Sequence, residues 1–211
     1  MAPFELLLLS MLVAGSASLP TTGPPPSHRG NAARWDVHTT SDARSAQYWT
    51  KQGVEYQCFD GDRPSSSDVT RWLNFDRLWR LNEPAILSSN RGDTYITHYI
   101  REAILQVAYD DGIDASLISA VMMQESSGRA AIPCRVQSNN KLPKCGLLQT
   151  TGGSSFDEDH AQASISRMIR GGVAGDGLKQ ALDGNARYMS DIANRLLGWD
   201  GGGEGYALCE N

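Results

Sequence analysis

The sequence predicts a mainly α-helical domain that is exported from the cell and held by disulfides. Apolar residues recur at three- and four-residue spacing in several segments, and no segment has a comparable strand pattern. Four cysteines follow an N-terminal segment with the features of a signal peptide. The chain has 211 residues, 40% of them hydrophobic, which is enough for a substantial core. Its formal net charge of −5 argues against nucleic acid or an anionic membrane as a partner.

Residues 1–18 have the pattern of a secretory signal peptide. An apolar run over 6–13 leads into small residues, and the run is too short to cross a bilayer core of about 30 Å. We expect cleavage after Ala17 or Ser18 and a secreted, extracellular protein with no membrane association after cleavage. In an oxidising compartment the four cysteines form two disulfides, for which three pairings are possible.

The rest of the chain is interpreted as a lead-in and one domain. Residues 19–34 are rich in Pro and Gly and predict a flexible lead-in, whereas residues 35–211 form the domain. Residues 60–64 begin like a calcium loop, but Ser65 stands where the loop needs Gly and Arg71 where it needs Glu, so a solvated turn is expected. We predict no metal ion and no cofactor.

Two helices are expected in the first half of the domain. Ser67 and Asp68 suit a cap for a short helix that contains Val69, Trp72 and Leu78. A second helix runs from about Asp93 to about Val107 and ends at Asp110-Asp111-Gly112. The tripeptide Arg91-Gly92-Asp93 is interpreted as the start of this helix and not as an adhesion motif.

Three more helices follow. Asp114 caps a helix from Ala115 to about Ser127, which Gly128 closes. The fourth runs from about His160 to Ile169 and the last from about Asn185 to Leu197. Residues 171–177 are predicted to be a flexible connection between them.

Glu125 is the candidate for chemistry. Ile118, Val121 and Met122 precede it by seven, four and three residues, so the carboxyl group shares the apolar stripe of its helix. Burial favours the protonated form of a carboxyl group, which a general acid near neutral pH requires. The alternative is an exposed residue in the last turn of the helix.

Residues 121–128, Val-Met-Met-Gln-Glu-Ser-Ser-Gly, and 145–149, Cys-Gly-Leu-Leu-Gln, together resemble the paired Glu-Ser-Ser-Gly and Gly-Leu-Met-Gln motifs of soluble lytic transglycosylases and goose-type lysozymes. More narrowly, the chain resembles a group of secreted fungal proteins with this domain. The resemblance implies a lysozyme-like helical fold with a substrate cleft and Glu125 as general acid. It also implies that Ser126 and Ser127 orient the acid or the substrate, with helix capping as the alternative. Substrate-binding roles fall to Gly146, Leu147, Leu148 and Gln149.

The sequence departs from the family in two ways. No Asp or Glu lies between Glu125 and Asp157, so the base expected of an inverting hydrolase is missing from this stretch. A transglycosylase does without it, because the N-acetyl group of the substrate stabilises the transition state. The Tyr-Asn stretch that contacts the sugar is also absent, through divergence or an incorrect gene model; Tyr188 is the candidate to replace its Tyr. The loss would reduce or abolish activity.

The resemblance leads us to expect a monomer that cleaves β-1,4-linked N-acetylhexosamine polymers, peptidoglycan first. The alternatives are a chitin-cleaving hydrolase and a catalytically inactive glycan-binding protein. The cysteines Cys134 and Cys145 bracket the loop between the two motifs, and a disulfide there would fix Glu125 relative to Gln149. Cys58 would then pair with Cys209, unless Cys209 stays unpaired.

Overall fold

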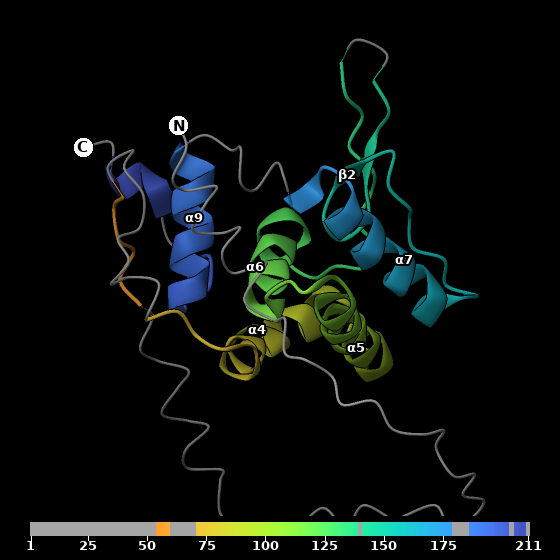
Figure 1. The fold of residues 1–211 in the computed structure, drawn as a ribbon, viewed down its shortest axis with the longest axis horizontal. Coiled ribbons are helices and arrows are strands. Elements are labelled where there is room, and N and C mark those ends of the chain that lie inside the picture. The colour runs from red at the N-terminus through yellow and green to blue at the C-terminus, as the bar shows by residue number, and fades with distance from the viewer. Residues whose placement is uncertain (1–53, 60–70, 139–140, 179–185, 203–204, 210–211) are drawn as a thin grey trace, which may run out of the picture.

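The computed structural model describes residues 54–59, 71–138, 141–178, 186–202 and 205–209 (Figure 1). The predicted signal peptide, the lead-in at 19–34, the turn at 60–64 and the cap at Ser67 lie outside the described residues. Within the described ranges the chain is mainly helical, as the sequence predicts. None of the helices in these ranges is long and apolar enough to cross a membrane.

Five α-helices, one 3-10 helix and two very short strands make up the described fold. In chain order they are α4 (Phe75–Ser89), α5 (Thr94–Asp111), α6 (Ala115–Ser126), β1 (Lys144–Cys145), β2 (Thr150–Thr151), α7 (Ala161–Ala174), α9 (Ala186–Leu197) and η1 (Gly205–Cys209). The strands are antiparallel, with Cys145 opposite Thr150. The caps predicted at Asp93 and Asp114 are confirmed, because each side chain accepts hydrogen bonds from the first turn of its helix.

Helix α6 is the central element of the fold. Nine of its 12 residues are buried, and it packs against α4, α5 and α9 (Figure 1). A helix that is apolar nearly all round has to be surrounded in this way. Helix α7 packs against α5. The last turn of α6 therefore stands on a rigid base.

The first helix begins later than the sequence predicts. Residues 71–74 are not helical, and Asn74 caps α4 by accepting a hydrogen bond from the amide of Arg77 at 3.1 Å. The reason is a tertiary contact: the amide of Leu73 donates to the carbonyl oxygen of Leu196 on α9 at 2.8 Å. That amide is therefore used between elements and not within a helix.

The fourth helix ends five residues later than predicted, so the first part of the expected connection at 171–177 is helical. Gly172 lies in this extension and is buried against Leu148, where an added Cβ would stand 2.7 Å from the Leu148 Cβ. The glycine is thus needed for close packing and does not mark a break in the helix.

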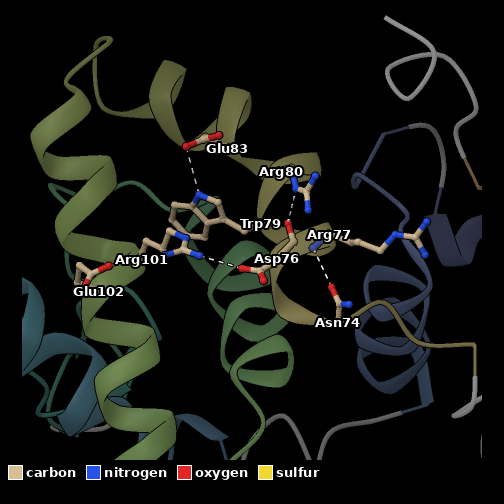
Figure 2. A network of polar contacts seen from close by, with 8 residues as sticks. All are labelled: Asn74, Asp76, Arg77, Trp79, Arg80, Glu83, Arg101 and Glu102. Carbon is tan, nitrogen blue, oxygen red and sulfur yellow. Dashed lines mark hydrogen bonds and ion pairs between the residues drawn. The ribbon is translucent and has the colours of Figure 1, made fainter. Parts of the chain in front are cut away.

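Figure 2 shows the polar contacts along α4 and the ion pair that joins it to α5. Arg101 of α5 forms an ion pair with Asp76 of α4 at 2.8 Å, and Trp79 donates its indole N–H to Glu83 within α4 at 3.2 Å. The guanidinium of Arg101 also lies 5.5 Å from the centre of the Phe75 ring. These are surface contacts between the two helices, whose packing against each other and against α6 comes mainly from buried apolar side chains.

Candidate functional site

Glu125 lies in the last turn of α6, and its side chain is 16% exposed. The carboxyl group is therefore mostly removed from water, as its place on the apolar stripe predicts. The helix ends directly after it, because Ser127 takes the left-handed conformation at φ 51° and Gly128 follows at φ 68°. An added Cβ at Gly128 would lie 2.7 Å from Ile86, so this exit from the helix requires glycine.

Tyr188 of α9 contacts the carboxyl group of Glu125. Its hydroxyl donates a hydrogen bond to Glu125 Oε1 at 2.7 Å. Burial, followed by the negative charge of Glu125 and this hydrogen bond, raises the pKa of Tyr188 far above its ordinary value. Tyr188 is therefore a neutral donor at any physiological pH. The structure thus brings into contact two residues that lie 63 positions apart and that the sequence indicated for different reasons, one as an acid and the other as a sugar contact.

Arg135 is a site residue that the sequence reasoning missed. Its Nη2 donates to the carbonyl oxygen of Glu125 at 3.0 Å, and its Nη1 lies 3.8 Å from Glu125 Oε2. The guanidinium binds the free carbonyl end of α6, where a cation is favoured. The excess of cations over anions in residues 126–156 is the sequence feature that could have predicted a cation beside Glu125.

A set of polar contacts, here called the α6–α9 seam, continues from the site into the interior. Gln124 donates to Asp191 Oδ2 at 3.1 Å and accepts from Arg195 Nε at 2.7 Å. Tyr56 donates to the other Asp191 oxygen at 2.7 Å, and burial, followed by this bond and the charge of Asp191, raises the pKa of Tyr56. The seam holds the residue next to Glu125 against the helix that carries Tyr188.

The serines after Glu125 belong to the end of the helix. The Ser126 hydroxyl is buried, donates to the carbonyl oxygen of Met122 at 3.0 Å and accepts from the amide of Gly128 at 3.2 Å. This is the capping role considered as the alternative for the serines. Ser127 is exposed at the C-cap. Their predicted contact with substrate stays a prediction.

The segment from Gly146 to Gln149 forms the tight connection between β1 and β2. Gly146 has φ 77°, and an added Cβ would lie 2.7 Å from the backbone oxygen of Ser154. Leu147 and Leu148 are buried in the core, so a role for them in substrate binding would have to use their backbone. Gln149 is 1% exposed, and its amide donates to the Gly146 carbonyl oxygen at 2.9 Å. Gln149 Oε1 accepts no hydrogen bond from the described residues.

Both disulfides proposed from the resemblance are present. Cys134 is bonded to Cys145, and Cys58 to Cys209. The first joins the loop that carries Arg135 to β1, and the second joins residues 54–59 to η1. The alternative of an unpaired Cys209 is therefore wrong.

The acidic residues 157–159 lie in the turn before α7. Asp157 Oδ2 stands 3.0 Å from His160 Nδ1, and hydrogen bonding to His160, more than any other cause, lowers the pKa of Asp157. These contacts are those of a solvated helix start. Elsewhere in the described ranges, no group of three or more His, Cys, Asp or Glu side chains is placed to bind a metal ion.

Comparison of this chain with protein-family models, with curated proteins and with solved structures finds no match. The support for a function therefore comes from the side chains around Glu125 and from the two sequence motifs.

Proposed function

We propose that this protein is a secreted enzyme that cleaves β-1,4-linked N-acetylhexosamine polymers, peptidoglycan first, with Glu125 as its only catalytic carboxyl group. The observation that carries the proposal is the mostly buried carboxyl of Glu125, placed at the end of a rigid helix and held at one oxygen by Tyr188. A lysozyme-like fold with a substrate cleft, as in lytic transglycosylases, is part of the proposal.

In the proposed reaction Glu125 gives its proton to the glycosidic oxygen of the leaving sugar. A protonated carboxyl group still accepts a hydrogen bond at its carbonyl oxygen, so Tyr188 can hold Oε1 while the proton is carried on Oε2. The N-acetyl carbonyl of the substrate attacks the anomeric carbon as the bond breaks. A hydroxyl group of the same sugar, or of water, then forms a bond to the anomeric carbon and displaces the N-acetyl oxygen, while Glu125, now ionised, accepts the proton of that hydroxyl group. This route needs no second carboxylate.

A glycan-binding protein without activity is the second candidate. The observation that favours it is the missing Tyr-Asn stretch, which contacts the sugar in the family that the sequence resembles.

The deciding experiment compares wild type with Glu125→Gln on bacterial cell walls and on chitin. We expect the variant to keep its fold and its binding to walls but to lose clearing by a factor of at least about a hundred, the scale of a lost general acid. Glu102→Gln, which changes an exposed acid on α5, is the matched control.

The mass of the products identifies the reaction. Anhydro ends indicate transglycosylation, and reducing ends indicate hydrolysis. Equal activity of wild type and Glu125→Gln would end the enzymatic proposal, and binding without products from wild type would establish the second candidate.

A further inference from the structure

Arg135 is held in place by its backbone and by its neighbour. Its amide donates to the Lys144 carbonyl oxygen at 2.8 Å, and the Lys144 amide returns a hydrogen bond at 2.9 Å. The residue before it, Cys134, is bonded to Cys145. Two hydrogen bonds and a disulfide therefore fix the backbone from which the side chain starts, and its contacts with Glu125 hold the guanidinium end.

The guanidinium lies beside the carboxyl group of Glu125 and faces solvent. Its side chain is 60% exposed, although it contacts both the backbone and the carboxylate of Glu125. An ion pair this exposed contributes little to stability. A guanidinium has five N–H donors in a planar fork, and this contact uses only one edge of it. The exposed edge is positioned to accept a second anion.

The hairpin that carries Arg135 has only cations of its own, although two carboxylates from other segments meet it: Glu125 beside Arg135, and Asp176, which accepts a hydrogen bond from the Thr151 amide of β2 at 3.0 Å. Residues 126–156 contain four cations and no anion, in a chain whose net charge is −5. Arg129, Arg135 and Lys141 are exposed, and Lys144 lies on β1 beside them. The hairpin that carries most of these residues extends away from the helices (Figure 1). A surface with one sign of charge attracts ligands of the opposite sign.

We propose that Arg135 is a specificity-determining residue that binds a carboxylate carried by the sugar next to the cleaved bond, so that the site prefers an acidic glycan to a neutral one. The inference rests on the proposed function, because it places the reacting bond at Glu125. Arg135 Nη1 is 3.8 Å from Glu125 Oε2, so a sugar in contact with Glu125 brings its substituents within reach of the guanidinium. Guanidinium binds carboxylate through two parallel hydrogen bonds, which lysine cannot reproduce.

The competing role for Arg135 is purely structural, as a cap for the carbonyl end of α6. A cap affects the position of Glu125 for every substrate alike, whereas a carboxylate-binding residue affects only substrates that carry a carboxylate. The ratio of the two activities therefore separates the roles.

The test measures kcat/KM on two sets of oligosaccharides of equal length: peptidoglycan fragments with free lactyl carboxylates, and neutral chitin fragments. For Arg135→Gln we expect the acidic-to-neutral ratio to fall about tenfold, because a charge-assisted pair is lost. Arg135→Lys restores part of the ratio. Added salt lowers the wild-type ratio through screening. Arg167→Gln, an exposed arginine on α7, is the control and keeps the wild-type ratio.

An unchanged ratio in Arg135→Gln, or equal losses on both substrates, overturns the inference.

Binding of the same two oligosaccharides to Glu125→Gln, with and without Arg135→Gln, is measured by calorimetry. This experiment is independent of cleavage. If wild type cleaves neither substrate, the proposed function fails, and the inference is then decided by whether Arg135→Gln removes the preference in binding.

Discussion

The hydroxyl of Tyr188 and the carboxyl group of Glu125 form the contact on which the proposed chemistry depends. Tyr188→Phe removes the hydroxyl and leaves the ring, so the packing of α9 is unchanged. We expect a loss of about 1 kcal/mol in stability and about tenfold in clearing rate, since the hydrogen bond that holds Glu125 Oε1 disappears.

A double-mutant cycle isolates this contact without reference to activity. Urea unfolding of Glu125→Ala, Tyr188→Phe and the double variant yields the coupling energy, which we expect to be about 1 kcal/mol. Tyr95→Phe, on an exposed tyrosine of α5, is the control and leaves stability unchanged. A coupling near zero would mean that the two side chains do not interact in solution.

Part of this site could be predicted from the sequence. Glu125 was found because helical spacing predicts which face of α6 a residue shares, and spacing is a local property. Arg135 and Asp191 were missed because their contacts with α6 arise from packing and from a turn. No spacing rule predicts such contacts. Asp191 and Arg195 stand three and seven residues after Tyr188, and this polar stripe on an otherwise buried helix was the available signal.

Helix α7 allows a direct test of why its glycines are there. Gly171 has nothing within 4 Å of an added Cβ, whereas at Gly172 that Cβ would lie 2.7 Å from Leu148. Gly171→Ala is therefore expected to stabilise the protein by about 0.5–1 kcal/mol through helix propensity. Gly172→Ala is expected to destabilise it by about 1–3 kcal/mol through overpacking.

Thermal unfolding of the two variants checks the difference, and each is the control for the other, because the same substitution is made in adjacent positions of one helix. Destabilisation by both would show that α7 ends before Gly171.

The helix ends were the least predictable parts of the fold. At α4 and α7 they depend on Leu73 bonding to Leu196 and on Gly172 packing against Leu148, which are contacts between distant segments.

The two disulfides act on the whole molecule to different degrees. Cys58 and Cys209 are 151 positions apart, and Cys134 and Cys145 only 11. Loop entropy in the unfolded chain alone predicts a loss of about 5 kcal/mol for removal of the first and about 3 kcal/mol for the second. Paired Cys→Ser variants unfolded in guanidinium check this order, and the reverse order would show that strain or residual structure dominates.

Residues 54–59 depend on the longer of these bridges. Tyr56 packs edge-on against Trp199, with ring centres 5.0 Å apart, and the backbone of Gln57 exchanges hydrogen bonds with Asn194. Such a short extended segment has few contacts of its own. The mainly helical class and the approximate positions of the helices could be predicted from the sequence, but this covering of α9 could not, because it needs a partner from the other end of the chain.

The Cys58–Cys209 bridge also determines what a single proteolytic cut does. A peptide bond broken anywhere between these two cysteines leaves two fragments that stay joined through sulfur. The clipped chain migrates as one band until a reductant separates it, and its intact mass rises only by that of one water molecule. Purified protein that looks whole without reductant can thus already be cut, and both halves remain available to hold Glu125 against Tyr188.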